Sequence, residues 1–353
     1  MELEDFFVLE NDKMSYVLKR MNVMGHGILL VGNMKHIEAV ITDGDIRRYW
    51  LLEKKEKGKA CDIANYKPVV LKISEASRER ISFIFNERKI KALPIISDNG
   101  ELQRIEFDNG EVIYKRASFD TKVVIMAGGK GTRLMPLTDV LPKPLIPVGN
   151  KVIIEHIIDQ FSVAGFWDFN IIINYKKELI KAFFSKDAYY NKNNIDISLW
   201  EEKAFQGTAG GLKLLQDEIK STFILSNCDI LVNADYESAI KEHKQNGNFI
   251  TVVCAPQKIQ IPYGTIKTNA ENEVIALEEK PLIECIVNTG LYVIEPQVIE
   301  LIEDEEFIHL TDLICRCIKK GYKVGSYKIM ENGWMDMGEI SKLKKMEDTL
   351  IRE

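Results

Sequence analysis

The residues best suited to chemistry lie in the stretch 123–148, where a glycine cluster is followed by two cations. An apolar run that suits a buried parallel strand leads into the cluster, which consists of Gly128, Gly129 and Gly131. Glycines let consecutive backbone N–H groups point into one concavity, and they let a polyphosphate approach the main chain closely. Arg133 and Lys143 add positive charge. The stretch therefore predicts a phosphate-binding loop, with an ordinary tight turn as the alternative.

This loop differs from the two best-known phosphate-binding loops. A Walker A loop needs Gly-Lys-Ser/Thr at the start of a helix, whereas Lys130 lies between two glycines. The glycine spacing of the dinucleotide-binding fingerprint is not matched either. Pro142 and Pro144 restrict the backbone on both sides of Lys143. A lysine held this rigidly favours a binding role over simple solvation.

Residues 128–148 resemble the signature of the sugar-1-phosphate nucleotidylyltransferases, GGxGTRLxPLT followed by PKPLxPV, at every position. Within that family the chain is most similar to the guanylyltransferases, which include the mannose-1-phosphate enzymes. The resemblance implies an α/β fold with a Rossmann-like, mixed and mostly parallel sheet. It also implies that the triphosphate is cradled by Ala127, Gly128, Gly129, Gly131 and Thr132.

Two aspartates far apart in the sequence match the metal ligands of this family. Asp229 follows an apolar strand candidate, where an unpaired carboxylate is costly to bury, and a helix N-cap is the alternative. Asp336 lies in a segment that resembles the Trp-x-Asp-x-Gly element of the family. Magnesium takes one or two protein carboxylates and fills its other positions with phosphate oxygens and water. The resemblance therefore implies a Mg²⁺ site at Asp229 and Asp336.

The segment 201–211 resembles the element that binds the nucleotide base. Its Gly-Thr-Ala-Gly sequence is more similar to the guanylyltransferases than to the uridylyl, thymidylyl or cytidylyl branches, and adenylyl enzymes tend to diverge after Gly-Thr-Ala. GTP is therefore the expected nucleotide. The resemblance assigns the base contacts to Gln206, Gly207, Thr208, Ala209 and Gly210.

Three short motifs downstream resemble the sugar pocket of the family. By resemblance Glu279 binds sugar hydroxyls, Lys280 binds the sugar phosphate, and Gly264 and Asn288 line the pocket. A solvated turn is the alternative for the Glu-Glu-Lys-Pro stretch. The order of these motifs along the chain favours the functional interpretation.

The implied reaction is the attack of a sugar 1-phosphate on the α-phosphorus of a nucleoside triphosphate, which releases pyrophosphate. Two polyanions must meet, so charge neutralisation and alignment dominate the barrier. No general base is required, because the attacking phosphate is already ionised. We assign the pyrophosphate to Arg133, and the α-phosphate and sugar phosphate to Lys143 and Lys280. A non-catalytic sensor of sugar nucleotides is the alternative.

The sugar is less constrained by the sequence. A catalytic domain with a leading module pair resembles guanylyltransferases of nonulosonic (legionaminic) acid pathways, which use glucosamine 1-phosphate and form GDP-glucosamine. Mannose 1-phosphate and a heptose phosphate remain alternatives.

The elements that must position these residues alternate between strand and helix. We expect strands at 123–126, 169–174, 195–200 and 222–225, and helices at 152–164, 177–184 and 209–220. Such alternation predicts a mostly parallel sheet with helices on both faces. Ligands bind at the carboxyl ends of the strands in sheets of this kind.

The first part of the chain repeats one pattern of helix, strand, turn and strand. The candidates are 14–24, 28–31 and 37–41, and then 76–87, 92–96 and 102–107. Asn109-Gly110 predicts a tight hairpin, and the polar stretch 111–121 predicts the junction to the next domain.

This repeat resembles a pair of CBS modules, a small α+β unit that binds adenine nucleotides in many proteins. Thr42 and Asp45 match the ribose-binding Thr-x-x-Asp motif, and helix capping is the alternative. The second pass lacks the motif. Because module pairs dimerise, we expect a homodimer. The predicted domains are a regulatory or dimerising CBS pair, 1–118, and a catalytic domain, 119–353.

The overall composition excludes several classes of protein. Of 353 residues 46% are apolar and 28% charged, as in ordinary globular proteins. A net charge of -6 argues against a nucleic-acid-binding protein. No apolar stretch approaches the ~18 residues of a spanning helix, and the acidic N-terminus is unlike a signal peptide. We therefore expect a cytoplasmic protein without nucleic-acid or membrane partners. The chain ends soon after Asp336, so we expect no C-terminal hexapeptide-repeat domain.

Overall fold

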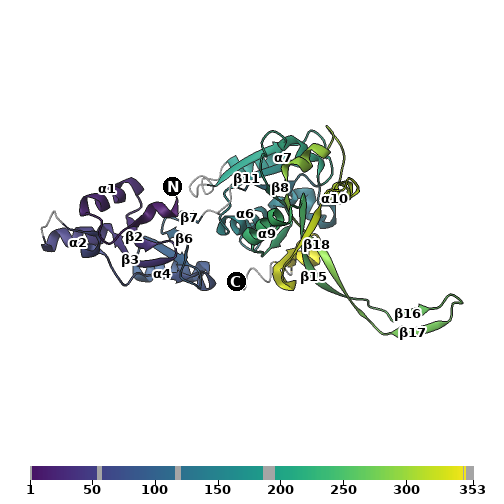
Figure 1. Cartoon of the computed structure of the whole chain (residues 1–353), viewed down its shortest axis with the longest axis horizontal. Helices are drawn as coiled ribbons and strands as arrows, with labels where there is room; N and C mark the ends of the chain where they lie inside the picture. The colour runs from purple at the N-terminus through teal and green to yellow at the C-terminus, as the bar shows by residue number, and fades with distance from the viewer. Residues whose placement is uncertain (1, 54–57, 116–120, 186–194, 345, 347–353) are drawn as a thin grey trace.

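The computed structural model describes residues 2–53, 58–115, 121–185, 195–344 and 346. Figure 1 shows two bodies, one built from residues before 116 and one from residues after 120. We call them the N-terminal body and the C-terminal body. The predicted domain boundary between residues 118 and 119 lies outside the described residues.

The N-terminal body consists of two similar halves. In each half a helix precedes an antiparallel strand pair that carries a bulge, and a two-residue strand pairs in parallel with the first strand of that pair. The first half contains η1 (Leu3–Phe6), β1 (Phe7–Val8), α1 (Met14–Met24), β2 (Ile28–Asn33), β3 (His36–Thr42) and α2 (Asp43–Glu53). The second contains α3 (Ala60–Ile63), β4 (Leu71–Lys72), η2 (Ile73–Glu75), α4 (Arg78–Arg88), β5 (Ala92–Ile96), β6 (Leu102–Phe107) and β7 (Val112–Tyr114). The predicted helices and strands of both passes are therefore present.

Several boundaries in this body differ by one or two residues from the sequence-based prediction, and two differences have an identifiable cause. Helix α4 begins two residues later than expected, because the Ser77 hydroxyl accepts a hydrogen bond from the Arg80 N–H and caps the helix there. The stretch expected to be a polar junction instead begins with β7. Val112 and Ile113 are buried, and Ile113 pairs with Ile105 of β6 across the predicted hairpin.

The C-terminal body is built on a seven-stranded sheet in the order β12-β11-β8-β13-β18-β15-β19. Six strands run in one direction and β18 runs against them. The sheet is therefore mixed and mostly parallel, as predicted. Its strands are β8 (Val123–Ala127), β11 (Asp168–Ile173), β12 (Asp196–Glu201), β13 (Phe223–Asn227), β15 (Ile250–Gln260), β18 (Leu282–Ile294) and β19 (Val324–Lys328).

Both faces of this sheet are covered. Along β8, Val123 and Ile125 belong to one hydrophobic cluster with helices α6 (Ile153–Val163), α7 (Lys177–Ser185) and α9 (Tyr236–Asn246). Val124 and Met126 belong to a second cluster with η5 (Gly210–Leu215), η6 (Pro296–Leu301) and α10 (Leu310–Lys319). Since consecutive strand residues point to opposite faces, a strand buried on both sides is apolar throughout. This explains the continuous apolar run that precedes the glycine cluster.

The predicted helix 209–220 is wrong. The segment forms only the short 3-10 helix η5 and then a turn. Gly210 and Gly211 are weak helix formers, and the main chain of Gly210 packs directly against the carbonyl of Glu306. Tertiary packing therefore overrides the helical periodicity of the residues that follow.

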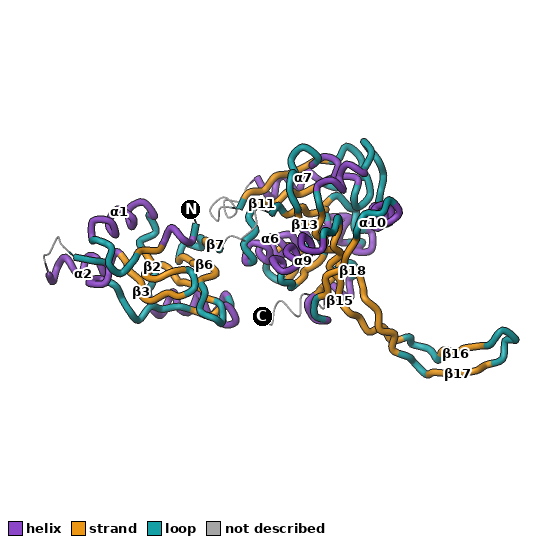
Figure 2. The backbone as a smooth tube through the Cα atoms, in the orientation of Figure 1, coloured by secondary structure: helices purple, strands orange, loops and turns teal. Residues whose placement is uncertain are grey.

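Smaller elements complete the C-terminal body. They are η3 (Thr132–Leu134), α5 (Leu137–Val140), η4 (Lys143–Leu145), β9 (Pro147–Val148), β10 (Lys151–Val152), β14 (Ile230–Val232), η7 (Glu331–Gly333) and β20 (Trp334–Asp336). Beyond the sheet, β15 and β18 continue as a two-stranded ribbon that ends in β16 (Thr265–Thr268) and β17 (Val274–Glu278). Figure 2 shows this ribbon projecting from the body, and we call residues 256–286 the arm.

The helices of the described residues are at most 11 residues long. None of the helices in these ranges combines the length and the apolar character needed to cross a bilayer.

Candidate active site

The glycine loop and Asp229 follow two neighbouring parallel strands. The loop comes directly after β8, and Asp229 comes two residues after β13, which pairs with β8. Lys143 begins the short helix η4, where Pro142 and Pro144 flank it. Its ammonium group forms an ion pair with the Asp229 carboxylate, and only 12% and 13% of the two side chains are exposed. The structure thus joins two predicted site residues that are 86 positions apart.

Asp336 reaches the same place through a second pairing. Strand β20 pairs with β14 so that Asp336 lies opposite Ile230, and the Met337 N–H donates to the Asp229 carbonyl at 2.9 Å. One Asp336 oxygen accepts a hydrogen bond from the Gly338 N–H at 2.6 Å. The other accepts one from the Lys342 ammonium at 2.7 Å. Two aspartates separated by more than 100 residues therefore stand side by side.

The chemistry of this pair is compatible with Mg²⁺. Among the described residues, no cluster of three or more His, Cys, Asp or Glu side chains forms a closed metal cage. Two adjacent carboxylates with lysines beside them leave most coordination positions to other oxygens. Magnesium in phosphoryl-transfer sites prefers one or two carboxylates together with phosphate oxygens and water.

Arg133 points toward the same region from η3. A Cβ atom placed on Gly338 would lie 3.5 Å from the Arg133 guanidinium and 2.9 Å from the Asp336 carboxylate. Arg133 is exposed, so its charge is available to a ligand. Three cations, Arg133, Lys143 and Lys342, thus gather with two carboxylates at this edge of the sheet, an arrangement that can bind a polyphosphate together with a divalent cation.

The glycines of the loop have distinct structural roles. Gly131 has φ +64°, and a Cβ there would lie 2.9 Å from Thr138 and 3.3 Å from Lys143, so it permits the packing that holds Lys143. Gly129 has no described atom within 4 Å of its Cβ position, which leaves its main chain open to a ligand. Ala127 is buried and Thr132 is exposed.

Glu202 lies in the predicted base-binding segment 201–211, but no sequence motif assigned it a role of its own. It follows β12, and 2% of the residue is exposed. A Cβ on Gly128 would lie 2.5 Å from one carboxylate oxygen, and a Cβ on Gly211 would lie 2.7 Å from the other. Among the described residues neither oxygen has a hydrogen-bond partner. The carboxylate therefore lies between Gly128 of the glycine loop and Gly211.

Burial raises the pKa of Glu202 to about 7. The nearby backbone of Gln206 lowers the pKa of Glu202 to a smaller degree. Its position does not meet the geometric criteria of a hydrogen bond to the carboxylate. A buried and unpaired carboxylate is costly in free energy, so its position favours a ligand with two hydrogen-bond donors. In the sequence, the indication that Glu202 could belong to a site was its position just after the strand expected at 195–200.

The predicted base-binding residues are held mainly by protein contacts. Gly207 has φ +82°, and a Cβ there would lie 2.4 Å from the Ile308 carbonyl oxygen. The Thr208 hydroxyl accepts a hydrogen bond from the Leu310 N–H at 2.9 Å, and the Ala209 N–H donates to Ile308. The Gln206 carbonyl accepts one from the Ile308 N–H. These contacts, with that of Gly210, fix the segment against residues 306–310 and so position Gly211 beside Glu202.

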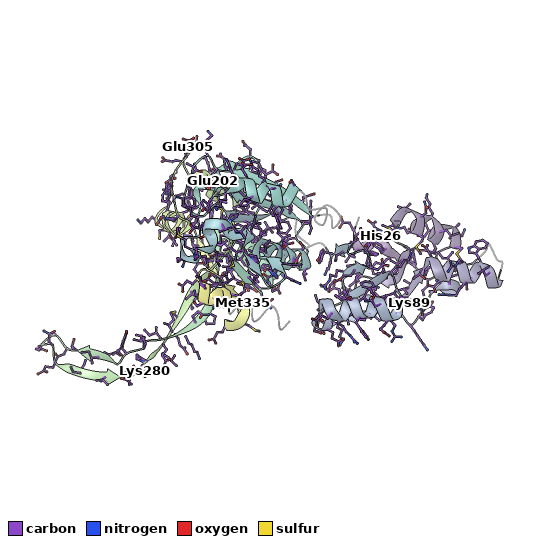
Figure 3. All side chains as sticks on the ribbon, turned by 180° about the vertical axis from the view of Figure 1, so that it is seen from behind. His26, Lys89, Glu202, Lys280, Glu305 and Met335 are labelled. Carbon is purple, nitrogen blue, oxygen red and sulfur yellow. The ribbon has the colours of Figure 1, made fainter. Side chains whose placement is uncertain are left out.

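The predicted sugar-pocket residues are divided between the arm and the body. Gly264, Glu279 and Lys280 lie on the arm, where a Cβ on Gly264 would lie 2.8 Å from the Glu279 carboxylate. Asn288 pairs with Cys254 in the inner part of β18 and donates to the Tyr292 hydroxyl at 2.6 Å. In Figure 3 Lys280 lies on the arm, whereas Glu202 and Met335 lie in the body. Within one chain the structure does not bring Lys280 to Lys143 and Asp229.

A second candidate site lies in the N-terminal body. A cavity of about 620 Å³ opens between the two halves. Asp45 accepts hydrogen bonds from the Thr42 hydroxyl and N–H at 2.6 and 2.9 Å, so these two residues cap α2 while facing the cavity. Five cationic residues contribute to its lining, namely Arg47, Arg48, Arg88, Lys89 and Lys91.

Comparison with known proteins identifies similarities for the C-terminal body. The family model described as Nucleotidyl transferase matches residues 122–353. The chain is 30% identical over 236 residues to a UTP–glucose-1-phosphate uridylyltransferase of Synechocystis sp., covering 62% of this chain and 60% of that protein. It is 35% identical over 190 residues to a mannose-1-phosphate guanyltransferase of Candida albicans, covering 52% of each. The chain thus spans only about half to three fifths of the length of these curated relatives.

Solved structures show the same fold. HddC from Yersinia pseudotuberculosis superposes with a TM-score of 0.53 at 22% identity, covering 65% of this chain and 99% of that one. A second structure of HddC, in complex with GMP-PN, superposes equally well.

Proposed function

The chain belongs to the nucleotidyl transferase family, and from this we propose that it is a sugar-1-phosphate nucleotidylyltransferase. An oxygen of the sugar 1-phosphate forms a bond to the α-phosphorus of a nucleoside triphosphate, and the bond from that phosphorus to the pyrophosphate oxygen breaks. The products are a nucleoside diphosphate sugar and pyrophosphate. The observation that carries the proposal is the group of Arg133, Lys143, Asp229 and Asp336 at the carboxyl ends of β8 and β13.

The residues of this group act by binding, orienting and neutralising phosphate. In our proposal the main chain at Gly128, Gly129 and Gly131 receives the triphosphate, and Arg133 neutralises the leaving pyrophosphate. Lys143 holds the α-phosphate in line with the attacking oxygen. Asp229 and Asp336 would hold Mg²⁺, which when bound would neutralise charge on the phosphate oxygens.

The test is pyrophosphate release from mixtures of a nucleoside triphosphate and a sugar 1-phosphate. We expect Asp336→Ala to abolish release while the circular dichroism spectrum stays unchanged, since Asp336 is half-buried and not part of a hydrophobic core cluster. Lys342→Met is the matched control, because it removes the hydrogen-bond partner of Asp336 but keeps the carboxylate. Full magnesium-dependent activity of Asp336→Ala would refute the metal assignment. Binding of a sugar nucleotide without any turnover would favour the sensor alternative.

GTP is the nucleotide that Glu202 supports best. Guanine presents an N–H and an amino group side by side, and the two oxygens of an ionised carboxylate can accept both hydrogen bonds. Uracil and thymine present one N–H between two carbonyl groups, which a carboxylate repels. Adenine places a ring nitrogen acceptor beside its amino group. The relatives at about 30% identity include both uridylyl and guanyl enzymes, so this buried carboxylate is the discriminating feature.

Competition among the five common nucleoside triphosphates would test this assignment. GTP should give the highest kcat/KM, and Glu202→Gln should lower it for GTP more than for UTP. A preference of the wild-type protein for UTP or dTTP would overturn the guanine assignment.

For the sugar we propose glucosamine 1-phosphate, which would make the product GDP-glucosamine, a precursor in nonulosonic (legionaminic) acid synthesis. Mannose 1-phosphate is the alternative. The proposed pocket residues Gly264, Glu279 and Asn288 include a carboxylate that suits either an ammonium or a hydroxyl group. A screen of sugar 1-phosphates with GTP decides between them.

The cavity of the N-terminal body supports a second, regulatory function. We propose that this body is a CBS pair and that the cavity binds an adenine nucleotide, with Thr42 and Asp45 at the ribose and the surrounding cations at the phosphates. Titration of the protein with AMP, ADP and ATP by calorimetry tests it. Arg88→Ala should weaken nucleotide binding, and the separate variant Asp45→Ala should weaken it by a larger factor. No binding at millimolar nucleotide would contradict this function without affecting the catalytic proposal.

A further inference from the structure

The arm is the largest part of the C-terminal body that stands apart from its core. Within the described ranges, none of its side chains belongs to a hydrophobic core cluster. Nine of its large apolar side chains are between 48% and 74% exposed. A two-stranded ribbon is at best marginally stable by itself in water. Such an exposed apolar surface therefore indicates a binding partner.

Three apolar residues of the arm tip share one face, on either side of a register shift that leaves Ile275 without a partner in β16. In the register of β16 and β17, Ile266 lies opposite Leu277, and Val274 lies opposite Thr268 on the same face. The other face carries Lys267 opposite Ala276. Because directly opposed residues of an antiparallel pair point the same way, Ile266, Leu277 and Val274 form one apolar stripe. The tip is thus amphipathic and has a defined docking face.

The arm also carries residues that the proposed function requires. Lys280 is eight positions from Asn288, whose surroundings belong to the body. At about 3.3 Å per residue, Lys280 lies roughly 26 Å along the ribbon from that point. Figures 1 and 2 show the ribbon leading away from the body. The site formed by Lys143, Asp229 and Asp336 is therefore incomplete within one chain.

The same chain offers a surface that matches the arm. Between Arg133 and Lys143, the side chains of Met135, Leu137 and Val140 are 50%, 43% and 71% exposed. An apolar arm tip that covered them would bring Glu279 and Lys280 toward the phosphate loop. An acceptor of this kind, beside the incomplete site, identifies a second copy of this chain as the partner.

We propose that two copies of this chain exchange arms, so that Glu279 and Lys280 of each copy complete the active site of the other. This inference rests on the proposed function. A twofold exchange uses the same two surfaces on both copies and closes the assembly. Burial of one half-exposed side chain removes on the order of 50 Å² from water. Nine arm side chains and three acceptor side chains from each of two copies then amount to about 1,200 Å², the lower end of the range for a specific interface.

Sedimentation of the full-length chain tests the docking face. The double variant Ile266→Lys/Leu277→Lys places charge on the apolar stripe and should lower the association constant of the dimer below that of the wild type. Ala276→Lys is the control, since it adds a positive charge to the opposite face of β17, and it should associate like the wild type. A wild-type protein that is monomeric at micromolar concentration overturns the proposal, whatever its activity.

Complementation tests whether the arm acts in the partner's site. The Lys280→Ala variant has an impaired arm and an intact C-terminal body. The Asp336→Ala variant has an intact arm and an impaired C-terminal body. If arms are exchanged, a mixed dimer contains one intact site, and random pairing restores about one quarter of the wild-type activity. A mixture no more active than its two parents shows that each arm serves its own body and overturns the proposal. Because the wild-type protein is assayed alongside, absence of any nucleotidyl transfer is recognised separately as failure of the proposed function.

Discussion

Glu202 is the residue whose surroundings place the strongest constraint on the ligand. It is buried between Gly128 of the glycine loop and Gly211, and no described residue donates a hydrogen bond to it. Protein interiors rarely retain such a group without a use, because its desolvation opposes folding. A ligand that donates two hydrogen bonds would offset this cost and restore the charge of the carboxylate.

We expect the affinity for GTP to rise as the pH increases through about 7. The protonated carboxyl group presents a donor where guanine also presents donors, so only the ionised form binds well. Glu202→Gln should weaken GTP binding by about 2 kcal/mol or more, roughly 30-fold, at pH 8. Calorimetric titrations at pH 6, 7 and 8 measure both effects. The variant controls for ionisation of the triphosphate itself, and an equal pH dependence in both proteins would contradict the role of Glu202.

The same group links pH to the stability of the free protein. Its pKa in the folded state is about 7, against an ordinary 4.5, so the unfolded chain releases this proton first as the pH rises. The contribution of Glu202 to the free energy of unfolding is greatest below pH 4.5, and it decreases by up to about 3 kcal/mol toward pH 7. Urea unfolding should therefore show that Glu202→Gln gains stability relative to the wild type between pH 5 and pH 8. A constant difference would indicate that the carboxylate is not buried.

At the scale of elements, the segment 206–210 is held by its close approach to residues 306–310. Gly207 combines φ +82° with an Ile308 carbonyl oxygen only 2.4 Å from its Cβ position. We expect Gly207→Ala to destabilise the protein by about 3 kcal/mol, from backbone strain and overpacking together. Gly247 has φ +61° with no described atom within 4 Å, so Gly247→Ala should show the strain alone, about 1 kcal/mol. Equal losses in chemical denaturation would show that the contact with Ile308 is not tight.

A buried polar network connects helix α9 to the sheet at another place. His243 is fully buried, and its ring nitrogens contact the Thr251 hydroxyl at 2.8 Å and the Glu295 carboxylate at 3.0 Å. Burial lowers the pKa of His243, although Glu295 opposes the shift. The unfolded chain therefore takes up this proton first as the pH falls.

The free energy of unfolding should therefore decrease as the pH drops below 6.5, the ordinary pKa of histidine. Above pH 6.5 the contribution of His243 to this free energy should be constant. Denaturation at pH 8, 6.5 and 5.5 measures this dependence. In His243→Gln the acid sensitivity should decrease, whereas the exposed His36→Gln should leave it unchanged. If the pH dependence were instead lost in the His36 variant, His243 would not be its cause.

At the scale of the whole molecule, the two bodies have separate hydrophobic cores. No core cluster of the described residues contains side chains from both bodies. We expect two thermal unfolding transitions in calorimetry. Leu93→Ala and Ile171→Ala each remove a fully buried side chain, one in each body, and should cost about 3 kcal/mol locally. Each variant should therefore shift a different transition, and a common shift of both would show that the bodies unfold as one unit.

Elements whose cause is local could be predicted from the amino-acid sequence. The apolar run of β8, the glycines and prolines of the loop, and the helices α1 and α6 are present where their patterns predict them. Period and turn chemistry act over a few residues, so they can be inferred from the chain directly. The family signature likewise identified Lys143, Asp229 and Asp336 as related to one another, but without any geometry.

Features that depend on contacts between distant residues became apparent only in the folded chain. Strand β20 brings Asp336 beside Asp229 through pairing across about 100 residues, and packing against residues 306–308 prevents the helix expected at 209–220. Glu202 gained significance only through its position between Gly128 and Gly211, because burial without a partner is a property of the folded state. The separation of Lys280 from the other charged residues was also invisible in the sequence, since a continuous strand pattern does not reveal whether its ribbon lies on its own body or on another.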